Sequence, residues 1–74
     1  MNQPLTQLQV GQEGEVTAIE SVGAGRLAHL STLGIVPGSR VTLRQRHFAY
    51  VVQVGETEVA LDAEVAREIV VRVG

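Results

Sequence analysis

The chain alternates apolar and polar residues over several short stretches, and one stretch between them has helical spacing instead. Alternation with a period of two is typical of strands. The predicted strands cover residues 15–20, 40–46, 50–54, 57–61 and 69–73. In the helical stretch, apolar residues recur every three positions, at Ala24, Leu27, Leu30 and Leu33, which predicts one apolar stripe along a short helix. The pattern therefore predicts a mainly β domain with one real helix.

The end of this helix has clear signals. Gly34 follows the last residue of the stripe, where a left-handed position favours glycine, and Ile35 follows where a contact back onto the helix is common. Pro37 and Gly38 then predict a type II turn, because proline presets one φ angle and glycine supplies the positive one. At the other end, Ser21 or Gly23 is expected near the N-cap.

Three positions on this helix fall off the apolar stripe and are expected to face water. They are Arg26, His29 and Ser31. The stripe itself is first a core element, and in a second interpretation some of it lines a groove for a partner.

Weaker signals complete the prediction for the first part of the chain. Residues 1–4 are expected to be loose, and Leu5 and Leu8 are expected to reach the core from a single helical turn. Gly11 and Gly14 are expected to bracket a turn. The first strand needs a bulge near Thr17, since its apolar residues otherwise point to opposite faces.

In the second part of the chain, two turns are predicted. Gly55 and Glu56 form a two-residue hairpin connection, for which glycine suits the first position. Asp62 is a plausible N-cap for a single helical turn over 63–67. About five strands, one short α-helix and one or two single helical turns indicate a small SH3-like barrel. Residues 1–74 are expected to form one domain.

The run LGIVPGSRV over 33–41, preceded by a small glycine-rich amphipathic helix, resembles the signature of the FeoA family. The resemblance covers roughly 5–73, and the segments GETEVAL and AEVAREIVV match the C-terminal half of the family. The chain departs from the family at His47-Phe48-Ala49, where members often carry a longer loop with a Gly-Asp turn. The resemblance implies an SH3-like fold, a cytoplasmic location, a family-level association with transition-metal ions, and binding to the ferrous-iron transporter FeoB.

Composition narrows the chemistry further. The chain has no cysteine, which excludes a disulfide scaffold, a thiolate metal site and a cysteine nucleophile. It has no segment like a signal peptide and no apolar run long enough for a membrane span, so direct membrane insertion is not expected. The net charge of −2 gives no general attraction to nucleic acid. Oligomerisation or a partner would add to the modest stability expected of so small a core.

The candidate partner-binding residues come from the helix and the following strand. They are Arg26, Leu27, Leu30, Leu33, Ile35, Arg40, Arg44 and Arg46. The three arginines on one strand face are either a solvated outer face or a surface for an acidic patch on a partner, since arginine suits carboxylate recognition. A nucleic-acid surface is a further alternative, although stacking aromatics are nearly absent.

Catalytic and metal chemistry have little support in the sequence. His29 and His47 are the only imidazoles and are separated in the predicted fold, whereas a metal needs several converging ligands. No catalytic motif or phosphate loop is present. We therefore predict a non-enzymatic protein without cofactor or metal, which resembles FeoA and modulates iron uptake through an FeoB-like transporter. The alternative is an SH3-like regulatory module of the kind found at the C-terminus of metal-dependent repressors. Self-association stays open.

Overall fold

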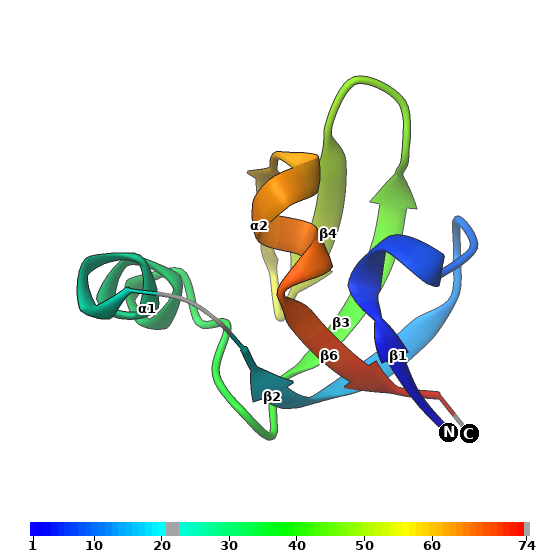
Figure 1. The fold of residues 1–74 in the computed structure, drawn as a ribbon. Helices are drawn as coiled ribbons and strands as arrows, with labels where there is room; N and C mark the ends of the chain where they lie inside the picture. The colour runs from blue at the N-terminus through cyan, green and yellow to red at the C-terminus, as the bar shows by residue number, and fades with distance from the viewer. Residues whose placement is uncertain (21–22, 74) are drawn as a thin grey trace.

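The computed structural model describes residues 1–20 and 23–73. The described strands form one antiparallel sheet in the order β1-β6-β2-β3-β4-β5, so β1 and β5 are its edges. Along the chain the elements are β1 (Asn2–Pro4), the 3-10 turn η1 (Leu5–Gln7), β2 (Glu13–Ile19), α1 (Ala24–Thr32), β3 (Arg40–Gln45), β4 (Tyr50–Val54), β5 (Thr57–Leu61), α2 (Ala63–Arg67) and β6 (Ile69–Arg72). Figure 1 shows α2 and η1 over the curved sheet, α1 standing apart at one side, and the two chain ends together.

The core lies on the inner face of the sheet and under η1. Val41 and Leu43 of β3 are fully buried, as the alternation predicts, and so are Leu5 and Leu8 at either end of η1. The β2–β6 register shifts between Val16 and Ala18, which confirms the predicted bulge. The mainly β class is confirmed, and the core is aliphatic because the sequence offers almost nothing else.

The prediction of a loose N-terminus is wrong. Asn2, Gln3 and Pro4 pair with β6, so the sheet has six strands rather than about five. A strand of this length is too short for its alternation to be recognised. Pro4 is tolerated because β1 is an edge strand. Proline has no N–H to donate, and at the edge of a sheet this loss interrupts no hydrogen bonding between inner strands.

Gly14 also lies elsewhere than predicted. Gly11 forms the turn, with φ +90°, but Gly14 is a buried residue inside β2. A Cβ at Gly14 would lie 3.2 Å from the carbonyl oxygen of Arg72 and 3.3 Å from Cβ of Val71. A side chain at this position would therefore require the neighbouring strand β6 to shift by a few tenths of an ångström, and glycine avoids this close contact.

Helix α1 ends as the sequence predicts. Gly34 has φ +86°, its N–H donates to the carbonyl of Ser31 at 3.0 Å, and the N–H of Ile35 donates to the carbonyl of Leu30 at 2.9 Å. These two bonds are those of a Schellman motif. Gly38, with φ +99°, completes the predicted Pro-Gly turn. At the start of the helix, Gly23 is the N-cap and caps without a side chain, and the alternative Ser21 lies outside the described residues.

The two remaining turns are confirmed. Gly55 has φ +60°, and Val54 pairs with Thr57 across a two-residue connection. The side chain of Asp62 accepts a hydrogen bond from the N–H of Val65 at 2.8 Å and so caps α2. α2 therefore begins where its cap dictates, directly after β5.

Candidate functional site

A groove of about 430 Å³ runs between α1 and the segment that joins β5 to α2. Leu30 and Leu33 come from α1, and Leu61 and Val65 come from the opposite wall. Leu30 and Leu61 are buried, whereas Leu33 and Val65 are half-buried and offer apolar surface to the groove. Arg26, His29 and Asp62 add polar groups around these four side chains. The arrangement suits an apolar ligand side chain with charged groups beside it.

Arg26 links α1 to the C-terminal end of α2. Its Nη1 donates to Oε1 of Glu68 at 2.7 Å, and its Nη2 lies 3.8 Å from Oε1 of Glu64. The hydrogen bond and the charge of Glu68 raise the pKa of Arg26 above its ordinary value. The side chain is about one-third exposed (37%), so the expectation that Arg26 simply faces water is too simple. It connects the two walls of the groove.

The structure divides the other helix candidates. Leu30 and Ile35 are buried in the core, at 1% and 0% exposure, and only Leu30 also lines the groove. Leu27 is 45% exposed and is not among the groove-lining residues, so the prediction that it is a core residue is wrong. The reason is that one face of α1, formed by residues 26, 29, 30 and 33, lines the groove, and position 27 lies at the edge of that face. His29 and Ser31 are exposed as predicted.

The three strand arginines do not form one row. β3 pairs Leu43 with Val52 but Gln45 with Val51, so a bulge at Arg44 shifts the register. Beyond this bulge, Arg46 donates to the carbonyl oxygens of Leu8 at 3.0 Å and Thr6 at 3.1 Å. Arg46 therefore ties the hairpin to the end of η1, and only Arg40 and Arg44 share a shallow hollow on the outer face.

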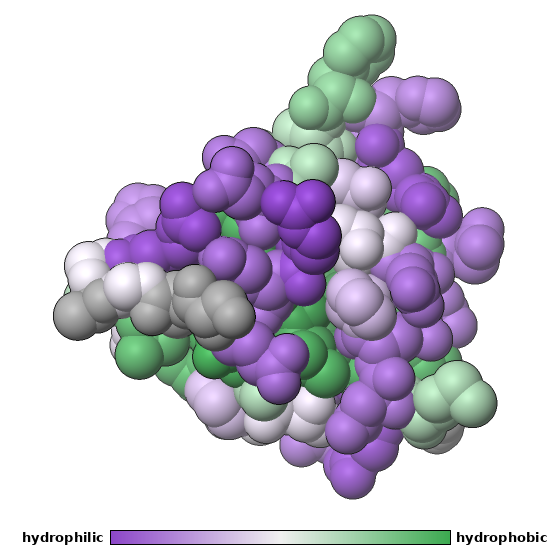
Figure 2. All heavy atoms as spheres, in the orientation of Figure 1, coloured by the Kyte–Doolittle hydropathy of each residue, from purple (hydrophilic) through white to green (hydrophobic). Residues whose placement is uncertain are grey.

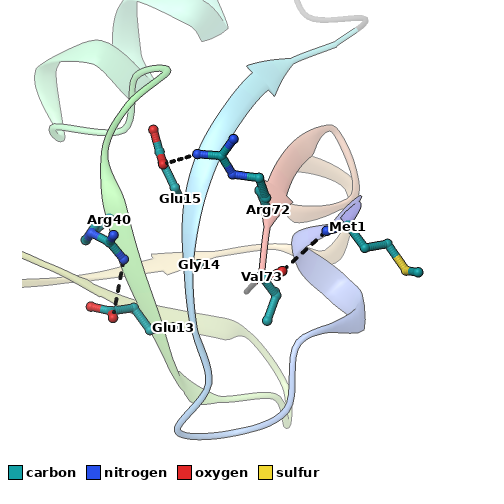
Figure 3. Close-up of a pocket in the computed structure, with 7 residues that line it drawn as sticks. All are labelled: Met1, Glu13, Gly14, Glu15, Arg40, Arg72 and Val73. Atoms are coloured by element: carbon teal, nitrogen blue, oxygen red, sulfur yellow. Dashed lines mark hydrogen bonds and ion pairs between the residues drawn. The ribbon is translucent and has the colours of Figure 1, made fainter.

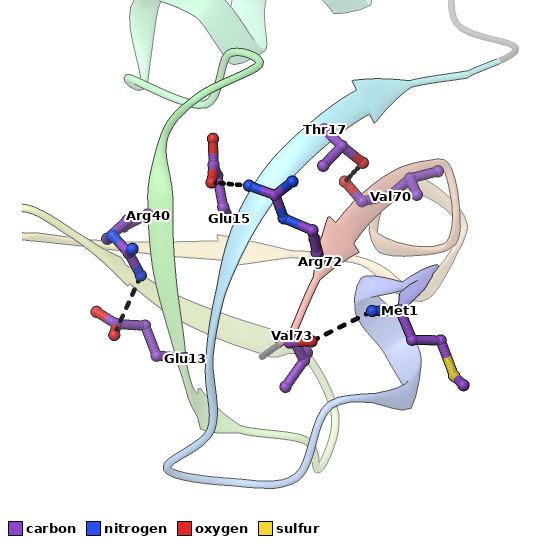
Figure 4. A network of polar contacts seen from close by, with 8 residues as sticks. All are labelled: Met1, Glu13, Glu15, Thr17, Arg40, Val70, Arg72 and Val73. Atoms are coloured by element: carbon purple, nitrogen blue, oxygen red, sulfur yellow. Dashed lines mark hydrogen bonds and ion pairs between the residues drawn. The ribbon is translucent and has the colours of Figure 1, made fainter.

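The outer face around Arg40 is an ion-paired surface. Glu13 and Glu15 both belong to β2. Nη1 of Arg40 lies 3.5 Å from Oε1 of Glu13, and Nη2 of Arg72 lies 2.7 Å from Oε1 of Glu15 (Figure 3). Figure 4 adds the terminal ammonium of Met1, which donates to the carbonyl of Val73 at 3.3 Å. These exposed pairs contribute little stability each. Glu13 and Glu15 each already face a cation, so neither carboxylate of this surface is an evident site for a charged ligand.

The tip of the β3–β4 hairpin was not among the predicted site residues. Phe48 has φ +69°, the only positive φ of a non-glycine residue in the described chain, and its side chain is fully exposed. In Figure 2 hydrophobic green atoms stand out of the surface at the place where Figure 1 draws this hairpin tip. The available signal was a lone phenylalanine beside Arg46 and His47 in a turn.

Sequence reasoning also missed the far wall of the groove. Leu61, Asp62 and Val65 line it, yet each has an ordinary local role at a strand end or in a short helix. No local pattern marks them, since the groove exists only where α1 meets a segment far along the chain. Within residues 1–20 and 23–73, no three histidine, cysteine or acidic side chains are grouped to hold a metal ion. No helix among the described residues is long and apolar enough to cross a membrane.

Comparison with known protein families agrees with the fold and the turns described above. The model of the FeoA domain matches residues 3–73. The chain belongs to the FeoA family. The matched range includes the helix, the Schellman ending and the Pro-Gly turn that carried the resemblance. FeoA domains are small SH3-like modules linked to ferrous iron transport, and they are not a known enzyme family.

Two solved FeoA structures resemble this family member over nearly its whole length. One, described as the iron uptake regulatory protein FeoA, is 25% identical with a TM-score of 0.87, covering 97% of this chain and 96% of the other. The FeoA of Stenotrophomonas maltophilia, complexed with zinc and described as a prokaryotic SH3 domain protein, is 27% identical with a TM-score of 0.81, covering 97% and 89%. Among curated proteins, none matches the sequence significantly.

The same fold occurs inside larger metal-dependent regulators. IdeR of T. acidophilum has a TM-score of 0.93 at 19% identity, and the alignment covers 99% of this chain but only 34% of the IdeR chain. A manganese-dependent transcriptional repressor has a TM-score of 0.89 at 22% identity, with 99% and 42% covered. At these identities the likeness concerns the fold alone.

Proposed function

We propose that this FeoA-family chain is a cytoplasmic accessory protein that binds the cytoplasmic part of an FeoB-like transporter and modulates ferrous iron uptake. The single observation that supports the docking site is the groove between α1 and the β5–α2 segment. Family membership supports the link to iron transport. Catalysis and iron binding by the chain itself are not part of this proposal.

The groove is suited to a protein ligand for two reasons. Its volume of about 430 Å³ accommodates a few side chains, so a short peptide segment or one turn of a partner helix fits better than a whole cofactor. Its polar groups, Arg26 and Asp62, carry opposite charges and lie beside apolar side chains. An amphipathic segment that presents one or two apolar anchors would satisfy both.

The wall formed by α1 can adjust to a ligand. Leu30, Leu33 and the Schellman motif hold the C-terminal half of the helix to the core. The N-terminal half is held through Arg26 and its contacts to Glu68 and Glu64. Small movements of that half would open or close the groove without exposing the core.

The test is an amide NMR titration of the labelled protein with the soluble cytoplasmic domain of FeoB, in chelator, with and without guanine nucleotide. Docking at the groove predicts shifts or broadening clustered on residues 26–35 and 60–65. If the shifts cluster elsewhere, the groove is not the docking site. If nothing changes in either nucleotide state, the chain does not bind the soluble domain.

Variants separate the groove from the rest of α1. Ala60 is exposed and lines the groove, so Ala60→Arg fills the groove without touching the core. Ala28 is exposed on α1 and does not line the groove, which makes Ala28→Arg the matched control. We expect Ala60→Arg to abolish the titration response and Ala28→Arg to preserve it. Equal effects of the two changes would contradict the groove assignment.

The likeness to IdeR and to the manganese-dependent repressor supports a second candidate function, a regulatory module that packs on a DNA-binding domain. The same groove would then receive a segment of that domain. Titration with an isolated repressor DNA-binding domain tests this candidate. Shifts at the groove with that domain, and none with the transporter domain, would replace the first proposal by the second.

A further inference from the structure

The tip of the β3–β4 hairpin holds a strained and fully exposed aromatic residue. The N–H of Ala49 donates to the carbonyl of His47 at 2.7 Å, which closes a three-residue γ-turn around Phe48 with its φ of +69°. This handedness of γ-turn is rare and strained. The side chain of Gln45 donates to the same carbonyl at 2.8 Å and braces the turn. The backbone is therefore held in a costly shape that points a phenylalanine into solvent.

The charge around this tip is one-sided. Residues 44–50 at the tip include Arg44, Arg46 and His47 and none of the eight acidic residues of the chain. Arg44 and Arg46 lie on different sides of the hairpin. Arg46 donates to the carbonyl oxygen of Thr6 in η1, whereas Arg44 lines the hollow on the outer face. Figure 1 shows the tip projecting beyond α2 and η1. A flat anionic surface would therefore meet this part of the molecule first.

We propose that this hairpin is a weak membrane-contact arm, which inserts Phe48 into the headgroup region of an anionic leaflet while Arg44 and His47 face the phosphates and Arg46, bonded to the carbonyls of Leu8 and Thr6, adds positive charge behind the tip. Phenylalanine on one side and arginines on the other are the residue types that bind membrane interfaces. Each arginine near an anionic leaflet raises the affinity about fivefold, which corresponds to about 1 kcal/mol. The remainder of the chain carries all the acidic residues and is repelled, so the contact has one orientation.

The energetics predict a reversible contact, since a single ring and a few arginines do not anchor a protein alone. Such a contact would raise the effective concentration of the protein at the membrane and would add to any second contact there. This goes beyond the proposed binding to a transporter, and it differs from the expectation of no membrane insertion in that one side chain enters the headgroup region without a spanning segment. Its test contains no transporter domain, so the two proposals fail independently.

The test uses the absence of tryptophan from the chain. Phe48→Trp places a single indole at the tip, and its fluorescence is followed during titration with vesicles of phosphatidylglycerol mixed with phosphatidylcholine. We expect emission to move to shorter wavelength and to be quenched by brominated lipid. We expect neither change with phosphatidylcholine alone, nor at about 1 M salt, where the Debye length is about 3 Å.

Cosedimentation with the same vesicles provides the matched controls. Phe48→Ser should remove binding, whereas Val36→Ser, at an exposed apolar residue in the Pro-Gly turn before β3, should not. Arg44→Gln should weaken binding about fivefold, whereas Arg67→Gln on α2, away from the hairpin tip, should leave it nearly unchanged. The fold is not at risk in these variants, because the four side chains are exposed.

Strain gives an independent readout. Phe48→Gly relieves the positive φ, so it should raise the melting temperature by roughly 4 °C while it abolishes vesicle binding. Such opposite effects are expected of a residue kept for binding rather than for stability. Unchanged emission of Phe48→Trp with anionic vesicles would overturn the proposal. In a separate titration without vesicles, an emission shift with the transporter domain, alongside none with anionic vesicles, would make Phe48 an anchor for a protein pocket instead.

Discussion

The two helices of this domain are held in opposite ways. α2 has five residues, a side-chain cap from Asp62 and a fully buried Ala66, and it lies between β5 and β6 against η1. α1 has nine residues, but Gly23 caps it without a side chain, and Leu30 is the one fully buried side chain among those described on it. The shorter helix is fixed along its length and the longer one is fixed chiefly at its C-terminal end. The groove therefore lies between one helix that is anchored along its length and one that is anchored chiefly at one end.

The largest effect should come from the contact that fixes α1 to the core. Leu30→Ala should lower the free energy of unfolding by about 2–5 kcal/mol, because it removes a buried side chain and leaves a cavity. Leu27→Ala, one turn earlier at 45% exposure, should cost less than about 1 kcal/mol. Urea denaturation of both variants checks the pair. Equal losses would show that the exposed edge of α1 is packed as tightly as its buried face.

Two glycines of the α1 region should respond with opposite signs. Gly34→Ala should destabilise the protein by about 1–2 kcal/mol, since φ of +86° is unfavourable for an L side chain. Gly25→Ala, within the helix and with open space around its Cα, should stabilise by about 0.5–1 kcal/mol through helix propensity. Thermal unfolding distinguishes them. A loss at both positions would mean that the N-terminal half of α1 is less regular than described.

The caps provide a third test of the contrast. Asp62→Ala should cost about 1 kcal/mol, because α2 loses the side-chain bond to the N–H of Val65. Gly23→Ser should add a few tenths of a kcal/mol, because α1 gains a cap that it lacks. Chemical denaturation measures the first effect, and hydrogen exchange of the α1 amides measures the second. No loss for Asp62→Ala would show that packing alone fixes α2.

The smallest effect is expected for the polar link between the helices. Arg26→Gln should reduce protection of the first-turn amides of α1 slightly and leave α2 unchanged, because an exposed ion pair contributes little. Glu68 raises the pKa of Arg26. The guanidinium therefore stays charged at every pH below that raised pKa and loses its proton only as the pH rises through it. The link should therefore persist unchanged through neutral and mildly alkaline pH. Global unfolding in Arg26→Gln would contradict this description.

Local signals in the sequence were sufficient for most of the fold. The Schellman ending at Gly34, the Gly55 hairpin and the Asp62 cap each need particular residues at particular backbone angles, so the residues predict the turn. Alternation placed Val41 and Leu43 inside. β1 escaped prediction, because an edge strand of three residues has no pattern of its own and exists through its pairing with β6.

The candidate site was less predictable than the fold. The sequence identified Leu30, Leu33 and Arg26, which belong to one helix face, but it also included Leu27 and Ile35, which do not line the groove. The strand arginines looked like one row, and the bulge at Arg44 separates Arg46 from the other two. A bulge depends on how two strands fit, and alternation in one strand cannot reveal it.

The class of the domain, its family, its turns and most residues of its core are therefore readable from the amino-acid order, because these depend on local backbone preference and burial. The three-dimensional arrangement was needed to find which wall faces α1, which acid pairs with Arg26, and that Phe48 is fully exposed at a strained tip. Those features depend on which segments, far apart in the sequence, come into contact in the fold. Residue spacing along the chain does not reveal such contacts.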